Sequence, residues 1–271
     1  MNGLRHAYPV HTLHNHDRKT LMFLEDGLHF VDCLHGMTQM PDASVDLVFA
    51  DLPYGRTQNN WDNPLPLIDF WKQISRVCKR RAALVFTAMQ PFTSLLVVSN
   101  LDWFRYEIIW KKNKVRGFLN ANRQPLRIHE NVLVFYREQP EYRPQMTTGH
   151  TAVHSYTKHT SDGSNYGKTK CGISGGGATT RYPTSILEIA VVNNDSVDRI
   201  HPTQKPVDLP AWFIKTYTLP GQLVLDPTAG SGSTLIAAQQ LNRRYIGFEN
   251  DEMSFKKATD ALKTAQRAST G

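Results

Sequence analysis

The chain has 271 residues, with 31 lysines and arginines against 24 aspartates and glutamates, which gives a net charge of +7. Hydrophobic residues make up 40% and charged residues 20%, which excludes wholesale disorder and is enough for a sizeable core. No apolar run approaches the roughly 20 residues that span a bilayer, and the first residues are polar and histidine-rich, unlike a signal peptide. We therefore expect a folded cytoplasmic protein.

The positive charge is concentrated in the middle of the chain. Residues 105–181 hold 13 basic and 5 acidic residues, a net charge of +8, whereas the remainder has a net charge of −1. Four tyrosines are interleaved with these cations, namely Tyr136, Tyr142, Tyr156 and Tyr166. Cations neutralise phosphates and rings stack on bases, so the segment favours nucleic-acid binding over the alternative of a solvated basic face without a partner.

The sequence indicates neither a disulfide framework nor a metal site. Cys33, Cys78 and Cys171 are widely separated and belong to no C-x-x-C pair. The histidines near the N-terminus have no distant partner residues, so we expect an exposed polar tail over residues 1–19.

Predicted strands and helices alternate in the N-terminal part of the chain. Strands are expected at 28–33, 45–50 and 82–87, with a helix at 67–79. This alternation predicts a mostly parallel, Rossmann-like sheet. Residues 106–110 and 131–136 are predicted to form an antiparallel pair at the sheet edge, because the segment between them is polar and has no helical period.

The pattern breaks at residues 138–180, which are rich in Thr, Ser, Gly, Tyr and Lys and are predicted to be an inserted, loop-rich module. Regular elements return as a helix, strand, helix, strand and helix at 206–217, 222–225, 233–241, 245–248 and 251–264. The tail at 265–271 is expected to fray.

A glycine-rich turn, Asp226-Pro-Thr-Ala-Gly-Ser-Gly-Ser-Thr234, follows the strand at 222–225. Open α/β sheets bind ligands at the carboxyl ends of their strands. Gly230 and Gly232 would let a nucleoside approach the backbone, and Glu249, one strand later, would accept hydrogen bonds from ribose hydroxyls. The turn lacks the lysine and the spacing of phosphate-binding loops, so a nucleoside without phosphates, such as S-adenosylmethionine, fits better than ATP or NAD.

A second polar turn, Asp51-Leu52-Pro53-Tyr54, follows the strand at 45–50. Together with the glycine turn it resembles the D-P-P-Y motif of DNA amino-methyltransferases, with Leu52 where the family usually has Pro. The resemblance implies that the Asp51 carboxylate and the Leu52 carbonyl accept the hydrogens of an exocyclic amine and direct its lone pair at the methyl group. Tyr54 would then stack on a base flipped out of the duplex.

Further segments, at 30–34, 129–135 and 201–206, resemble the same family in the motif order of its β class. The resemblance implies the class I methyltransferase fold, that is, a Rossmann-like mostly parallel sheet with an antiparallel edge hairpin and an inserted target recognition region. The chain then divides into a catalytic half (20–137), a target recognition insertion (138–180) and a cofactor-binding half (181–271).

The resemblance and the charge pattern together assign three sets of residues. Catalysis is assigned to Asp51, Leu52, Pro53 and Tyr54. Binding of S-adenosylmethionine is assigned to Asp32, which would contact its adenine, and to Asp51, Lys205, Asp226, Thr228, Ala229, Gly230, Gly232, Ser233, Thr234, Glu249 and Asn250. DNA binding is assigned to Trp61, Lys111, Lys112, Lys114, Arg116, Arg123, Arg127, Lys168, Lys170 and Arg181, several of them in a predicted loop at 111–127.

The predicted activity is methyl transfer from S-adenosylmethionine to the N6 amino group of adenine in double-stranded DNA, by base flipping and direct in-line attack without a metal. An Asp at position 51 favours adenine N6, because Ser is more typical of N4-cytosine enzymes in the β class. N4-cytosine methylation stays an alternative, as does a nucleic-acid-binding protein without turnover, and charge does not exclude RNA. Cytosine C5 methylation is excluded because no Cys follows a Pro.

The resemblance also bears on partners and source. It leaves open a cognate restriction endonuclease and a homodimer. It implies a bacterial, archaeal or phage origin.

Overall fold

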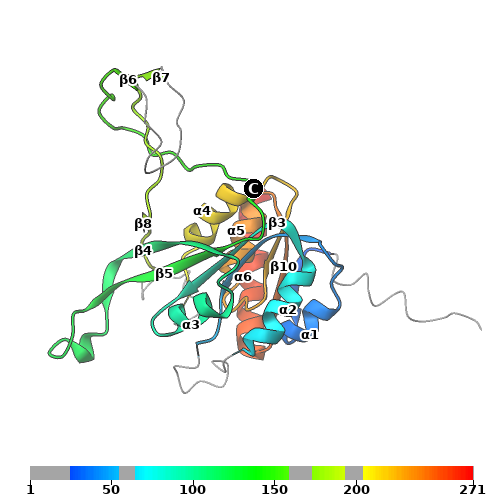
Figure 1. Ribbon diagram of the computed structural model, residues 1–271. Helices are drawn as coiled ribbons and strands as arrows, with labels where there is room; N and C mark the ends of the chain where they lie inside the picture. Colours follow the sequence, from blue (N-terminus) through cyan, green and yellow to red (C-terminus); the bar gives the residue numbers. More distant parts are fainter. Residues whose placement is uncertain (1–24, 55–64, 159–172, 193–203, 271) are drawn as a thin grey trace, which may run out of the picture.

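The computed structural model describes residues 25–54, 65–158, 173–192 and 204–270 (Figure 1). Three of the residues assigned to DNA binding, Trp61, Lys168 and Lys170, lie outside these ranges, as does the predicted N-terminal tail. None of the described helices is both long enough and apolar enough to cross a bilayer.

An eight-stranded sheet forms the centre of the described structure, in the order β1-β10-β9-β2-β3-β5-β4-β8. Parallel pairing joins β1 (Gly27–Phe30), β10 (Arg244–Glu249), β9 (Leu223–Asp226), β2 (Val45–Asp51) and β3 (Cys78–Ala88). The expected mostly parallel α/β sheet is confirmed.

The antiparallel pair predicted for the sheet edge is present but is not outermost. It consists of β4 (Phe104–Arg116) and β5 (Arg127–Phe135), and β5 is also antiparallel to β3. The short strand β8 (Ile186–Glu188), which the sequence did not predict, adds parallel to β4 and forms the edge.

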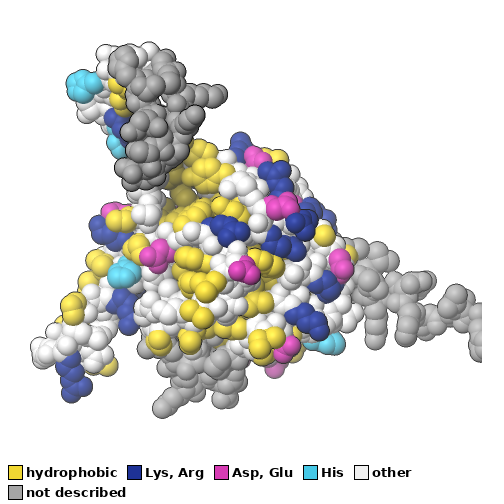
Figure 2. All heavy atoms as spheres, viewed as in Figure 1, with side chains coloured by type: hydrophobic (Ala, Val, Ile, Leu, Met, Phe, Trp, Pro, Cys, Tyr) yellow, Lys and Arg dark blue, Asp and Glu magenta, His cyan; other side chains and the backbone are white. Residues whose placement is uncertain are grey.

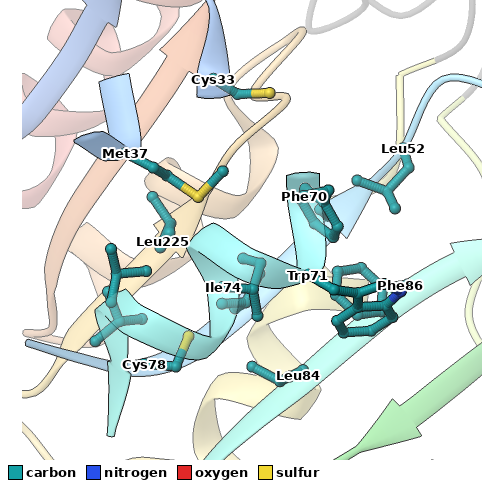
Figure 3. Close-up of a cluster of buried hydrophobic side chains, with 14 of the residues drawn as sticks. Cys33, Met37, Leu52, Phe70, Trp71, Ile74, Cys78, Leu84, Phe86 and Leu225 are labelled. Carbon is teal, nitrogen blue, oxygen red and sulfur yellow. The ribbon is translucent and has the colours of Figure 1, made fainter. Parts of the chain in front are cut away.

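Helices cover both faces of the sheet, because successive strand residues point to opposite sides. Val48 and Phe86 face a cluster formed with α1 (Cys33–Thr38), α2 (Leu67–Val77) and α3 (Phe92–Ser99). Figure 3 shows part of this cluster, including Met37, Phe70 and Trp71. Leu47 and Val85 face α4 (Asp208–Tyr217) and α5 (Ser233–Gln240), and α6 (Glu252–Thr270) packs beside α5 and β1.

The segment at 111–127, predicted to be a loop, is largely a two-stranded arm. The pairing of β4 with β5 continues outward from Lys111 and His129 to Arg116 and Arg127, and a 3-10 turn, η2 (Phe118–Asn120), closes the tip. Figure 1 shows this arm leaving the body of the molecule, away from the helices that cover the sheet. The loop prediction was wrong because backbone pairing with β5 stabilises a polar segment that carries no strand signal of its own.

The part of the predicted insertion (138–180) around residues 156–158 and 173–175 extends away from the central sheet (Figure 1), whereas its first residue contacts the sheet, because Glu138 N donates to the Arg80 carbonyl of β3 at 3.2 Å. In its described part, regular structure is confined to the strand pair β6 (Tyr156–Lys158) and β7 (Ile173–Gly175) and a bridge between Thr147 and Arg181. The division into two halves and a recognition insertion remains an interpretation.

The C-terminal tail departs from expectation, because α6 continues to Thr270 instead of fraying from residue 265. Ala261, Leu262 and Ala265 pack in a cluster with Leu235 and Ile236 of α5, and this contact stabilises the extra turns.

Candidate active site

The acidic turn and the glycine turn meet at the carboxyl ends of two neighbouring strands. β9 and β2 pair in parallel through Leu225 and Val48, and their connections run in opposite directions across the sheet, to β10 and to β3. Such a switch point is where open α/β sheets bind ligands. The Thr228 hydroxyl donates to the Asp51 carbonyl at 3.2 Å and joins the two turns directly.

The Asp51 carboxylate is held by side chains from three other parts of the chain. Its Oδ1 accepts from the hydroxyls of Tyr54 and Thr87, each at 2.5 Å, and its Oδ2 accepts from Lys205 Nζ at 2.6 Å. The Asp51 side chain is still 32% exposed, so the carboxylate is oriented and also accessible. Thr87 had no predicted role, although it ends a predicted strand beside Asp51 and lies opposite it in the β2 and β3 register.

A row of alternating charges runs from Asp51 into the base of the arm. Lys205 lies 3.3 Å from Oε2 of Glu130 on β5, and the other oxygen of Glu130 contacts the ammonium of Lys112 on β4. Burial alone would raise the pKa of Glu130, but the two ammoniums hold it below its usual value. Burial would lower the pKa of Lys205, but Asp51 and Glu130 raise it above its usual value. The structure therefore presents a salt-bridged row in which acidic and basic side chains alternate.

Lys112 does not lie where a DNA contact requires it. Its side chain is only 10% exposed, its ammonium pairs with Glu130 and it lies 4.6 Å from the ring centre of Trp110. The charge count suggested a phosphate contact because composition does not separate inward from outward cations. Glu130 belongs to a segment that the resemblance singled out, but no role was predicted for it.

Tyr54 and Leu52 occupy different environments. Burial, and then the charge of Asp51, raise the pKa of Tyr54 well above its usual value, so its hydroxyl stays a donor. The Tyr54 ring lies 5.0 Å from that of Phe92, between centroids, which fixes its position. Leu52 is buried among core residues (Figure 3), so the side chain that replaces the family's proline packs in the protein interior, and Pro53 is half-buried beside it.

Two glycines of the glycine turn, Gly230 and Gly232, have different surroundings. Gly230 and Gly232 both have positive φ, at 50° and 78°, which a side chain would disfavour. A Cβ at Gly230 would meet nothing closer than the Thr228 carbonyl at 3.9 Å, so its backbone is open to a ligand. A Cβ at Gly232 would lie 3.3 Å from Ala258 of α6, so the missing side chain leaves room for α6, and the close approach of a nucleoside to Gly232 stays a prediction.

Glu249 accepts hydrogen bonds with both carboxylate oxygens. Its Oε2 accepts from Gly230 N at 2.8 Å, and its Oε1 accepts from Asn250 N and Asp251 N at 2.9 and 2.8 Å. A carboxylate has about four lone-pair sites, so capacity for further donors remains. Burial raises the pKa of Glu249.

The other residues assigned to the cofactor are near this edge of the sheet. Asp32 caps α1 by accepting from Leu34 N and His35 N, and Val31 N donates to the Glu249 carbonyl at 3.0 Å. Asp226 is buried, accepts from Thr228 N at 3.1 Å, and its burial raises its pKa to about 7. Ala229, Ser233 and Thr234 are buried where the turn enters α5.

The cations assigned to DNA binding are placed unevenly. Lys111 pairs with Glu188 at the surface. The Arg181 guanidinium donates to the carbonyls of Thr151, Ala178 and Thr180 and so holds the insertion together. Four others lie exposed on the arm, and within the described part of the chain no carboxylate lies within 4.0 Å of them: Lys114, Arg116, Arg123 and Arg127.

Comparison with known proteins gives partial matches in sequence. YubD of Escherichia coli (strain K12), which is named as a methylase, is 48% identical over 73 residues, 27% of this chain and 32% of that protein. The type II methyltransferase M.HindIII of Haemophilus influenzae is 39% identical over 79 residues, 29% of this chain and 25% of that protein. The matched part thus spans a third or less of either relative.

Solved structures match over nearly the whole fold. The M1.HpyAVI-SAM complex has a TM-score of 0.56 at 17% identity and covers 86% of this chain and 96% of that chain. The PvuII DNA methyltransferase, described as cytosine-N4-specific, has a TM-score of 0.61 at 16% identity, and the match covers 89% of this chain and 92% of that chain. At such identity these likenesses show the fold, which is that of class I methyltransferases.

A family model described as DNA methylase, N6_N4_Mtase, matches residues 45–260. This range includes the acidic turn, the arm, the insertion and the glycine turn, and it bears out the resemblance to DNA amino-methyltransferases. The chain belongs to the N6/N4 DNA methylase family.

Proposed function

We propose that this chain transfers a methyl group from S-adenosylmethionine to the exocyclic amino group of a base in double-stranded DNA. The observation that carries the proposal is the placement of Asp51, oriented by Tyr54, Thr87 and Lys205, directly beside the glycine turn at the switch point. An acceptor for amine hydrogens thus lies next to a site suited to a nucleoside.

The residues present fit the cofactor. The open backbone at Gly230 leaves space for an adenosine, Glu249 has lone pairs left for ribose hydroxyls, and Asp32 lies one strand away. Lys205 would attract the carboxylate of the cofactor. When bound, S-adenosylmethionine supplies an electrophilic methyl group on sulfur.

Asp51 and the Leu52 carbonyl accept the two hydrogens of the target amine. An aromatic amine is a poor nucleophile, and two acceptors on its hydrogens turn its lone pair out of conjugation and toward the methyl. The amine nitrogen would take the methyl group that the cofactor supplies, and the proton that the nitrogen then releases would leave through Asp51 to solvent. The hydroxyls of Tyr54 and Thr87 fix Oδ1 during this step.

We propose adenine N6 as the target, because an Asp occupies the first position of the acidic turn. Cytosine N4 is the second candidate, and the likeness to the cytosine-N4-specific PvuII enzyme favours it. In either case DNA would bind across the arm cations and the insertion.

A role in DNA modification also suggests a partner, a compartment and an assembly for this chain. The type II name of M.HindIII supports a cognate restriction endonuclease as a partner, in the cytoplasm where DNA is accessible. A homodimer is the assembly to test, by light scattering.

Expression in a host without DNA methylation tests the proposal. DNA from that host is hydrolysed to nucleosides and analysed by mass spectrometry. We expect N6-methyladenine in DNA from cells that express the chain and none in the empty-vector control. N4-methylcytosine instead would move the assignment to the second candidate, and absence of both modified nucleosides would contradict the proposed function.

A further inference from the structure

The tip of the arm presents two large apolar side chains to solvent. Phe118 is 79% exposed and Leu119 is 98% exposed. They lie on a hydrogen-bonded turn, because Asn120 N donates to the Gly117 carbonyl at 2.9 Å and Ala121 N to the Phe118 carbonyl at 3.0 Å. The two side chains are therefore held out by an ordered turn that begins at Gly117, whose φ of 85° suits glycine.

Basic side chains flank this apolar tip on both strands. Arg116 and Arg127 lie directly opposite each other in the pairing of β4 with β5, and like charges so placed destabilise a strand pair. Lys114 and Arg123 are exposed nearby and, like the two arginines, have no carboxylate within 4.0 Å among the described residues. Figure 2 shows basic and hydrophobic side chains beside one another along the arm. The Arg127 guanidinium also donates to the Met89 sulfur at 2.8 Å, and the exposed cations on both strands suit the binding of an external polyanion.

The base of the arm lies beside the candidate active site. Lys112 on β4 contacts Glu130, which in turn lies 3.3 Å from the Lys205 that holds Asp51. Phe118 is only six residues beyond Lys112, so the tip reaches at most ~20 Å from that point. This is about six base pairs along a duplex, so the tip would contact the same DNA molecule as the catalytic turn.

We propose that Phe118 and Leu119 form a wedge that inserts between stacked base pairs of the bound DNA, while the arm arginines bind the phosphates on either side. The inference rests on the proposed function, since the polyanion is the DNA substrate. Apolar wedges of this kind part the base steps of a duplex and kink it. Parting a step near the target loosens the stack from which a base must be flipped.

Unwinding of closed circular DNA tests the wedge without knowledge of the recognition sequence. Relaxed plasmid is incubated with saturating protein and a topoisomerase, the protein is removed, and the change in linking number is read on a gel. We expect the wild type to lower the linking number and Phe118→Ala/Leu119→Ala to lose at least four-fifths of that change. The control, Leu95→Ala/Val98→Ala, removes two apolar side chains that are 61% and 68% exposed on α3, and it should unwind as the wild type does.

A second variant separates the wedge from phosphate binding. More of the Arg116→Gln/Arg127→Gln variant than of the wild type should be needed to saturate the plasmid, but the bound variant should unwind it fully.

Two results would overturn the wedge and leave the proposed function standing. One is full unwinding by the Phe118→Ala/Leu119→Ala variant, and the other is a wild type that methylates DNA without unwinding it. A tip variant that changes the oligomeric state or the binding to anionic vesicles, with unwinding intact, would assign the tip to a protein or a membrane instead. A wild type that neither binds nor methylates DNA would overturn the proposed function as well.

Discussion

Glu130 joins the Asp51 carboxylate to the arm through two lysines, and it is only 7% exposed. Removing water from charges costs free energy that is recovered only when each charge keeps its partner. Breaking one buried pair leaves the remaining charge uncompensated, which typically costs about 3–5 kcal/mol. The row of charges should therefore be sensitive to any single neutral substitution.

Glu130→Gln should lower the free energy of unfolding by an amount of that order, because Lys112 and Lys205 each lose a carboxylate while the side-chain volume is kept. Glu188→Gln is the matched control, since Glu188 pairs with Lys111 at the surface and is 69% exposed. The control should change stability by less than about 1 kcal/mol. Equal losses for the two variants in urea unfolding would show that the charge row is not buried as described.

Asp226 makes stability depend on pH. Burial raises its pKa to about 7, so ionisation is harder in the folded chain than in the unfolded one. The contribution of protonated Asp226 to the free energy of unfolding is complete below its pKa in the unfolded chain, about 4, and is lost as pH rises through its pKa in the folded chain, about 7. Relative to Asp226→Asn, which does not ionise, the wild type should therefore lose roughly 4 kcal/mol of unfolding free energy between pH 4 and 8. Urea unfolding across that range measures the difference, and a difference that does not change with pH would refute the buried acid.

The sequence predicted the strand-end motifs of the site but not the contacts that orient them. Asp51, Asp226 and Glu249 follow apolar runs, so their place at one sheet edge could be predicted from the chain. Thr87 and Glu130 reach Asp51 and Lys205 only through the register of β3 and β5, which no local pattern encodes. The inward direction of Lys112 has the same origin.

Elements differ in how much of their structure the sequence specifies. The buried strands β2, β3, β9 and β10 each contain a short apolar run and were predicted within a few residues, as were α2, α4 and α5. β3 begins four residues earlier than predicted, because the exposed Lys79, Arg80 and Arg81 carry no strand signal. By contrast, α1 has six residues and α3 is apolar on all sides, so neither shows a helical period. β8 has three residues and exists because β4 offers it an edge.

The tight packing of α1 against β10 can be tested by adding a side chain at their contact. A Cβ at Gly36 would lie 2.7 Å from the ring of the buried Phe248, so Gly36→Ala should cost about 1–3 kcal/mol of unfolding free energy. Gly27→Ala is the control, because a Cβ there would meet nothing closer than the His29 ring at 3.7 Å. Urea unfolding that finds both variants as stable as the wild type would contradict the packing of α1.

Across the whole molecule, the positive charge is confined to one central segment and the rest of the chain is nearly neutral. The net charge is −1 outside residues 105–181 and +8 within them, and the arm carries four cations without a nearby carboxylate in the described chain. Binding that neutralises phosphates releases counterions, so its affinity falls steeply with salt.

Salt should therefore weaken DNA binding much more than cofactor binding. Four phosphate contacts by the arm alone give a slope of about −3.6 for log affinity against log salt. Arg116→Gln/Arg127→Gln should reduce that slope by about 2. Fluorescence titrations with a DNA duplex and with S-adenosylmethionine between about 50 and 200 mM salt compare the two ligands. Equal salt sensitivity of the two affinities would contradict this separation of charge.

Methyl transfer by purified wild type and Asp51→Ala, measured with radiolabelled S-adenosylmethionine and double-stranded DNA, tests the central claim most directly. The wild type should label DNA, whereas Asp51→Ala should transfer at least about 100-fold more slowly, because the amine loses its acceptor. Equilibrium dialysis should show that the variant still binds the cofactor through the glycine turn and Glu249. Transfer by Asp51→Ala at nearly the wild-type rate would contradict the assignment of the active site.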